Sequence, residues 1–224
     1  MKVNDEILSR NLLQIIQGAS TQEKIKLLEK SLFEILNYDH RNFNEVLITE
    51  VKIKTKNKPK YFKNIHVGQV FEILLEDVQK YTYGVVIQGD LTQTKDDDIL
   101  IAYLDIFSDN PLEVSEISAH IERKNFIMIA NSGIYSIINY NWIFVFTHNE
   151  EIFSQEELNL ISYKTYFMGK YYKSVGDSNK DIASCIKIEE KEANFIPNPL
   201  GVIGDSSIIN KLCELYEEKS YRNK

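Results

Sequence analysis

The sequence predicts an α+β protein with a mainly antiparallel, strongly bent sheet, on which an N-terminal helical hairpin and a C-terminal helix pack. Apolar residues recur at helical spacing near both ends of the 224-residue chain, whereas from Val46 the period changes to a rough alternation of apolar and polar residues, and segments with strand character follow as far as Ile188. Gly68 and Gly84 lie within that interval, where glycine permits a bend or a close approach of two backbones.

Residues 1–42 are predicted to form the helical hairpin. The first helix ends at Gly18, and Ser20 with Glu23 offers a capping box for the second. The apolar stripes are Leu8, Leu12, Ile15 and Ile16 in the first helix, and Ile25, Leu28, Leu32, Ile35 and Leu36 in the second. Two short helices joined in this way fold back on each other, and we expect them to cover a sheet face.

Residues 43–224 are predicted to form the α+β domain, whose first part is rich in strands. The segments with strand character are 46–53, 69–75, 81–88, 99–107, 126–130 and 134–146. Segment 99–107 is largely apolar, which indicates a central strand buried on both faces. Asn110 is predicted to cap a short helix, with Pro111 in its first turn and Glu113 returning a bond to the cap.

The last third contains fewer clear signals. Ser154 is predicted to open a short helix through a capping box with Glu157, and Asp205 to cap the final helix. Segments 161–168 and 183–188 have strand character, and residues 194–204 are expected to form a loop.

Composition limits the classes of partner. The formal net charge is −7, which argues against unspecific binding to nucleic acid or to an anionic membrane, because both need a basic surface. The longest apolar runs are short, such as residues 142–146, whereas a membrane span needs about 20 residues. No charged leader precedes an apolar core at the N-terminus, so we expect no signal peptide and a cytoplasmic protein.

No motif of catalysis, metal binding or cofactor binding is found. The four histidines are scattered, and the Walker, GxGxxG and GxSxG patterns are missing. We therefore expect no metal, no cofactor and no enzymatic activity. The acidic residues Asp105, Asp109, Glu113 and Glu116 follow one another along a predicted strand end and helix start. Such carboxylates serve in acid–base catalysis, in an acidic binding surface, or simply in capping a helix.

Trp142 is the only tryptophan and lies in an aromatic stretch with Tyr135, Tyr140, Phe144 and Phe146. Aromatic residues at this density pack in a core, or they anchor an interface, where tryptophan and tyrosine carry much of the binding energy. Both roles are open from the sequence.

Three segments together resemble the immunity protein 26 family. They are Val67-Gly68-Gln69-Val70-Phe71-Glu72-Ile73-Leu74-Leu75, Tyr81-Thr82-Tyr83-Gly84-Val85-Val86 and Ile101-Ala102-Tyr103-Leu104-Asp105-Ile106-Phe107, and Trp142 matches the family's later tryptophan. The resemblance covers residues 65–148. Leu74 departs from it, because the family often has proline there, and residues 78–80 replace a turn that usually bears glycine.

The resemblance implies a bacterial immunity protein that binds and neutralises a cognate secreted polymorphic toxin in the cytoplasm of the producing cell. A basic nuclease domain is one such toxin, and Asp105, Asp109, Glu113, Glu116 and Trp142 are then the candidate partner-binding residues. The resemblance supplies no catalytic residue.

Two other classes of function remain open. Strands paired around Gly68 and Gly84 are compatible with a small barrel that binds a nucleic acid or a small ligand. A carboxylate enzyme centred on Asp105 and Glu113 needs a pocket in which these groups have raised pKa values.

Overall fold

The computed structural model describes residues 21–36, 49–54, 62, 65–89 and 99–222. The chain divides into two compact units, Met1–Lys58 and Pro59–Lys224. In the first unit the helix α2 spans Thr21–Leu36, and the carboxylate of Glu29 accepts a hydrogen bond from the backbone of Ile53 at 2.7 Å. The first predicted helix and the predicted cap Ser20 lie outside the described residues.

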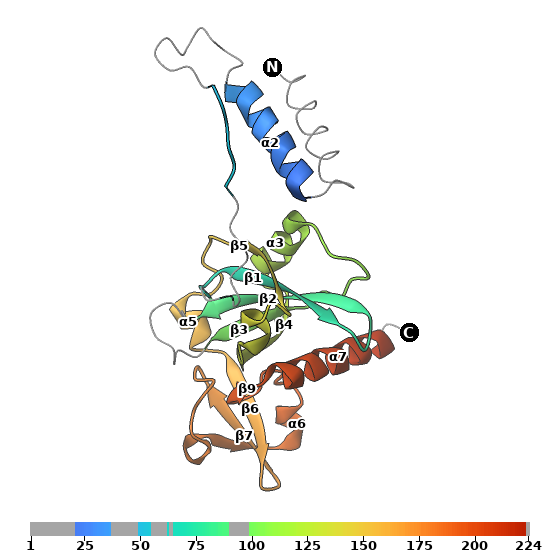
Figure 1. The fold of residues 1–224 in the computed structure, drawn as a ribbon. Helices are drawn as coiled ribbons and strands as arrows, with labels where there is room; N and C mark the ends of the chain where they lie inside the picture. Colours follow the sequence, from blue (N-terminus) through green and yellow to red (C-terminus); the bar gives the residue numbers. More distant parts are fainter. Residues whose placement is uncertain (1–20, 37–48, 55–61, 63–64, 90–98, 223–224) are drawn as a thin grey trace. The chain divides into compact units, whose positions relative to one another are not determined.

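The second unit is built on a larger, mostly antiparallel sheet, confirming the α+β class (Figure 1). In the described part of the chain this sheet has six strands in the order β5-β1-β2-β3-β4-β9, and it is open, because the end strands β5 and β9 do not pair with each other. The strands are β1 (Gln69–Leu75), β2 (Lys80–Gln88), β3 (Leu100–Leu104), β4 (Phe126–Ser132), β5 (Ile143–Thr147) and β9 (Val202–Ile203). Only β9, which pairs with β4, runs parallel to its neighbour.

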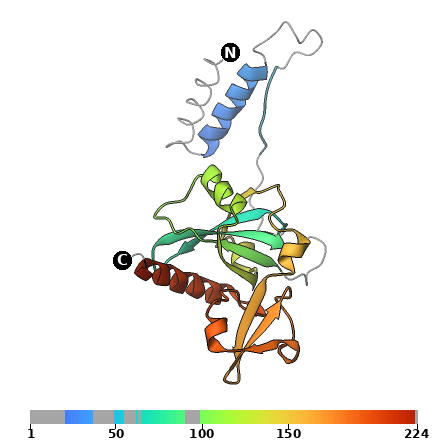
Figure 2. The same ribbon diagram turned by 180° about the vertical axis from the view of Figure 1, so that it is seen from behind.

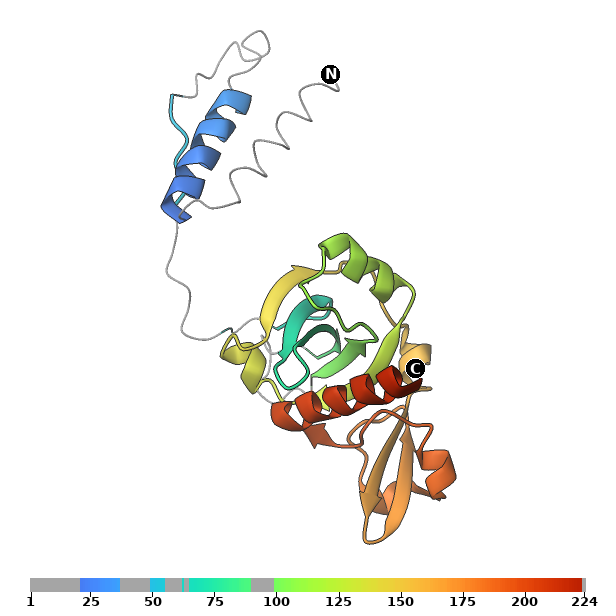
Figure 3. The same cartoon turned by 90° about the vertical axis from the view of Figure 1, so that its right-hand side faces the viewer.

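Two helices cover opposite faces of this sheet (Figure 3). The helix α7 (Asp205–Arg222) contributes Ile208 and Leu212 to a core cluster on one face, and α3 (Val114–Glu122) contributes Ile117 and Ile121 to the cluster on the other. All five residues of β3 are buried, which confirms the predicted central strand, although it ends three residues earlier than expected.

Alternation along β1 explains how one strand serves both clusters. Phe71, Ile73 and Leu75 belong to the α7 cluster, whereas Val70 belongs to the α3 cluster. Gly84 of β2 pairs with Phe71 on one side and Tyr103 on the other, and a Cβ at this position would lie 2.9 Å from Ile101. The absent side chain therefore makes room for the neighbouring large residues.

A second, three-stranded sheet follows, and in Figures 1 and 2 α7 lies between it and the larger sheet. Its strands are β6 (Ser162–Phe167), β7 (Lys170–Val175) and β8 (Ile186–Ile188), all antiparallel. The short elements are α4 (Tyr135–Ile138), α5 (Gln155–Leu158), the 3-10 helix η1 (Ile182–Ser184) and α6 (Glu190–Ala193). The capping box predicted between Ser154 and Glu157 is confirmed at the start of α5.

Several sequence expectations were wrong in detail. In the described part of the chain the larger sheet begins at Gln69: residues 49–54 of the predicted strand 46–53 form no strand, and residues 46–48 lie outside the described residues. The predicted strand 134–146 is divided into α4 and β5, and β7 was not predicted. The helix α3 is capped by Glu113 and not by Asn110, because the backbone of Leu112 donates to the Tyr83 hydroxyl at 2.7 Å and stays outside the helix.

Candidate partner-binding site

Two of the four predicted acidic residues form ion pairs with lysines distant in sequence. Asp105, just after β3, lies 2.8 Å from the Nζ atom of Lys219 on α7. Asp109 pairs with Lys80 at the start of β2, and the same ammonium lies 5.7 Å from the centre of the Tyr216 ring. These two carboxylates therefore already have counter-charges within the chain.

The other two acidic residues form the start of α3. Glu113 is the N-cap residue, and its backbone N–H donates to the Glu116 carboxylate at 3.2 Å. The backbone N–H of Glu116 donates in turn to the Glu113 carbonyl at 3.0 Å. Both side chains are exposed, so they contribute charge to the surface as well as order to the helix. Their role in binding a partner remains a prediction.

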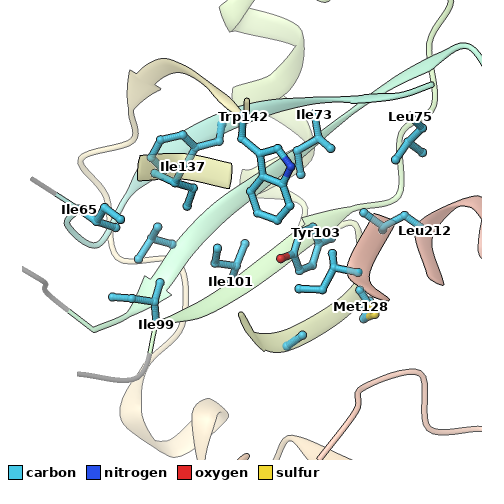
Figure 4. Close-up of a cluster of buried hydrophobic side chains, with 14 of the residues drawn as sticks. Ile65, Ile73, Leu75, Ile99, Ile101, Tyr103, Met128, Ile137, Trp142 and Leu212 are labelled. Carbon is cyan, nitrogen blue, oxygen red and sulfur yellow. The ribbon is translucent and has the colours of Figure 1, made fainter. Parts of the chain in front are cut away.

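Trp142 lies at the sheet, immediately before β5, and is only 3% exposed. Its ring packs edge-to-face on Tyr103 with the ring centres 6.1 Å apart, and Figure 4 shows its nitrogen on the side of the ring nearest Ile73. This Nε1 atom is buried and has no hydrogen-bond partner among the described residues. An unpaired buried donor costs about 1–3 kcal/mol, so a functional explanation is warranted.

A cavity of about 610 Å³ lies beside this tryptophan. It is lined by Glu72, Leu74, Glu76, Asp77, Tyr81, Ser136, Asn141, Trp142, Ile143 and Ile209. We call it the acidic cavity, because three of these residues carry carboxylates and none of the lining residues in the described part is basic. Leu74 and Glu72 alternate with Ile73 of the α7 cluster, so the cavity passes around the edge of β1.

Glu72 is the carboxylate with the clearest electrostatic signature in this cavity. Its partial burial raises its pKa above the ordinary value, and the Tyr83 hydroxyl, 3.4 Å away, opposes the rise only in part. Burial also raises the pKa of Tyr83. A carboxylate that has lost part of its hydration gains more from an incoming cation than a fully solvated one does.

The acidic cavity is suited to binding an ammonium or guanidinium group. Its carboxylates accept hydrogen bonds from such groups, and Leu74, Trp142 and Ile143 offer apolar surface for the methylene stems of lysine or arginine. Among the described residues, no group of three or more histidine, cysteine, aspartate or glutamate side chains is arranged so that it could hold a metal ion. Asp105 and Glu113 line neither this cavity nor the one described next.

A second cavity of about 250 Å³ lies between α7 and the small sheet. We call it the basic pocket, because its charged lining residues in the described chain are Lys164 and Lys211. Lys164 donates to the carbonyl of Ala193 at 2.6 Å, and Lys211 lies 2.8 Å from Glu214. Burial, and then the nearby Lys211, lower the pKa of Lys164.

Trp142 was predicted from the sequence as a candidate site residue, whereas the three carboxylates of the acidic cavity were not. A signal for Glu72 was present, because it is the one charged residue in the strand Gln69–Leu75. Glu76 and Asp77 occupy the following turn, where acidic residues are common and carry little information on their own.

No family model matches this chain, and comparisons with curated proteins and with solved structures also find no match. Within the described residues, no helix is both long enough and apolar enough to cross a membrane.

Proposed function

We propose that this chain is an immunity protein that binds and neutralises a cognate toxin, and that it receives a basic surface of the toxin in the acidic cavity. The observation that carries the proposal is the lining of this cavity: Glu72, Glu76 and Asp77 line it together with a buried tryptophan, and none of its described lining residues is basic. The resemblance of residues 65–148 to the immunity protein 26 family agrees with this function. The strongly bent sheet and the N-terminal helical hairpin remain part of the proposal.

The charge of the cavity fits a toxin that acts on nucleic acid. Such a toxin must approach phosphates, so its active face is basic. Carboxylates opposite that face speed association and fix the orientation of the two proteins. The net charge of −7 adds attraction at longer range when the salt concentration is low.

Trp142 links the sequence hypothesis to this cavity. It was a candidate interface anchor, and it forms part of the wall between the apolar core and the carboxylates. In contrast, Asp105 and Asp109 have lysine partners inside the chain, which reduces the charge they offer to another protein. We therefore place the main contact with the toxin at the acidic cavity and a secondary one at Glu113 and Glu116.

The test uses the toxin domain encoded by the gene next to this one. Wild-type protein is expected to protect cells that express the toxin domain, and to bind it one-to-one with slow dissociation. The triple variant Glu72→Gln, Glu76→Gln, Asp77→Asn is expected to associate about tenfold more slowly at low salt, because steering by charge is lost. Stopped-flow kinetics at several salt concentrations measure this change.

A matched variant, Glu113→Gln with Glu116→Gln, tests the carboxylates at the start of α3. If it slows association more than the triple variant does, the main contact lies at α3. If the wild-type chain gives no protection and does not bind the toxin domain, the proposed function is wrong.

A further inference from the structure

The strand β1 is longer than its outer neighbour in the sheet. It pairs with β2 as far as Leu75↔Lys80, but its pairing with β5 ends at Glu72↔Ile143. One edge of Ile73–Leu75 thus has no strand beside it among the described residues. An unpaired strand edge presents backbone donors and acceptors that another extended chain can use.

The gap beside β1 results from how the chain enters β5. The backbone N–H groups of Asn141 and Trp142 both donate to the carbonyl of Ser136, at 2.8 and 3.1 Å, and Tyr140 has a positive φ of 62°. These bonds hold the segment against α4, so it joins β1 only at Ile143. The free edge is therefore a defined feature of the fold and not a frayed strand end.

The acidic cavity lies along this free edge. Glu72 stands where β5 leaves β1, and Glu76 with Asp77 follows the far end of β1. Leu74, between them, is 41% exposed. The spacing along an antiparallel strand is about 3.4 Å per residue, so the free edge accommodates a short stretch of extended chain with carboxylates at both ends.

The buried indole of Trp142 supplies an independent indication of a ligand. Its Nε1 atom lacks an acceptor among the described residues, it lines the acidic cavity, and it lies on the side of the ring nearest Ile73 in Figure 4. A backbone carbonyl of a chain docked along Ile73–Leu75 is the kind of acceptor that this donor lacks. Because the nitrogen is covered in the free protein, docking requires a side-chain rearrangement around the indole.

We propose that an extended, basic segment of the partner adds to the sheet as a short strand along the free edge of Ile73–Leu75. Its backbone bonds to β1, one of its carbonyls accepts from Trp142 Nε1, and its lysine or arginine side chains lie against Glu72 at one end and Glu76 with Asp77 at the other. Recognition by strand addition gives affinity through the backbone and specificity through alternate side chains. This inference rests on the proposed function and specifies how the partner is held.

The first experiment uses the full chain and the blocked peptide Lys-Val-Arg-Val-Lys. Trp142 is the only tryptophan, so its fluorescence reports directly on docking. We expect saturable binding with a change in tryptophan emission. The same peptide with N-methylated backbone nitrogens is expected to bind about tenfold more weakly or worse, because strand addition needs those donors. The peptide Glu-Val-Glu-Val-Glu is expected not to bind.

Variants of the protein separate the contributions. Glu76→Lys with Asp77→Lys is expected to abolish peptide binding. Glu189 and Glu190 are an exposed pair outside the cavity, so Glu189→Lys with Glu190→Lys makes the same change in net charge and is expected to retain most of the peptide binding. Trp142→Phe is expected to weaken binding about three- to tenfold in calorimetry, since it removes the donor and keeps an aromatic ring.

The outcomes distinguish this inference from the proposed function. Equal binding of the N-methylated and unmodified peptides, or no saturable binding of the basic peptide, overturns strand addition. Concentration-dependent dimers that Glu76→Lys with Asp77→Lys disrupts would assign the edge to a second copy of this chain and also overturn it. Protection against the toxin domain is measured separately, so the proposed function can survive either result.

Discussion

The acidic cavity and the basic pocket lie on different faces of α7 and differ in how far their polar groups are already paired. Ile209 lines the acidic cavity, whereas Ile208 and Lys211 line the basic pocket. In the basic pocket Lys164 bonds to the Ala193 carbonyl and Lys211 pairs with Glu214. The acidic cavity contains an indole donor with no described partner and adjoins an unpaired strand edge.

This difference indicates which of the two regions is prepared for a partner. Hydrogen bonds already made within the chain must be broken or shared when a ligand arrives, whereas unmade ones are gained. The two sites carry the same kind of electrostatic cost on groups of opposite charge, because burial raises the pKa of Glu72 and lowers the pKa of Lys164. Both shifts reflect a charged form that is less favoured than in water, and an oppositely charged ligand relieves that cost only where it can enter.

The largest effect is expected from Leu212→Ala, which tests whether α7 is the common support of both regions. Leu212 is fully buried in the cluster between α7 and the larger sheet. The cavity left by the substitution is expected to lower the free energy of unfolding by about 2–5 kcal/mol. Urea denaturation measures the change, and Glu217→Ala, an exposed position on the same helix, is the control with an expected change within about 0.5 kcal/mol.

If Leu212→Ala changes the free energy of unfolding by no more than Glu217→Ala does, Leu212 does not anchor α7 to the larger sheet. The comparison of two cavities on one supporting helix then fails. If the variant is destabilised but keeps its peptide binding, the acidic cavity does not depend on a firmly packed α7.

A smaller, pH-dependent effect is expected from Tyr163→Phe in β6, the strand whose Lys164 lines the basic pocket; Tyr163 itself packs in the α3 cluster. Tyr163 of β6 is 1% exposed, and burial, followed by the charge of Asp177, raises its pKa to about 12. Since the folded-state pKa lies above the unfolded value of about 10, the protonated hydroxyl contributes stability fully below pH 10, and this is lost as the pH rises toward 12.

The Phe variant cannot lose that contribution, so it is expected to fall less steeply in stability between pH 10 and 12 than the wild type does. Denaturant midpoints across that range measure the slopes. Tyr166→Phe, on the same strand but 62% exposed, is the matched control and is expected to behave as the wild type. Identical slopes for wild type and Tyr163→Phe would show that Tyr163 is not protected by the fold.

The parts of the fold that were predicted from the sequence depend on local patterns. The strands β1 and β2 coincide with apolar runs bounded by turn residues, and the capping box links Ser154 and Glu157, which are only three positions apart. The segment 134–146 is divided into α4 and β5, and a bond distant in sequence supports the start of α4, where the Asp205 carboxylate accepts from the Ser136 backbone N–H. These residues are 69 positions apart, so no local pattern reports the contact.

The same limit explains the incomplete prediction of the site. Asp105 and Asp109 form an acidic cluster in sequence, but Lys219 and Lys80 are brought to them by tertiary structure. Conversely, Trp142 and Glu72 lie far apart in sequence and line one cavity only because β5 pairs with β1. The ion pairs with distant lysines therefore determine which carboxylates keep their charge available to a partner, and the sequence does not show these pairs.

The smallest effect is expected from Glu72→Gln, which tests whether the ionised Glu72 carboxylate lowers the stability of the free protein. The raised pKa of Glu72 means that the folded state prefers the protonated carboxyl more than the unfolded state does. Stability from this group therefore increases as the pH falls through the folded-state pKa toward the ordinary value of 4.5, and the cost is present at neutral pH. The neutral amide avoids this cost and can still accept a bond from Tyr83.

We therefore expect Glu72→Gln to be slightly more stable than the wild type at pH 7 and equal to it below about pH 4, and to bind the basic peptide more weakly at pH 7. Thermal melting at the two pH values measures the stability, and Glu76→Gln, an exposed carboxylate of the same cavity, is the control. If Glu72→Gln is less stable than the wild type at pH 7, the carboxylate stabilises the free protein. Glu72 then already has favourable partners within the chain, as the lysines of the basic pocket do, and the contrast between the two cavities fails at this position.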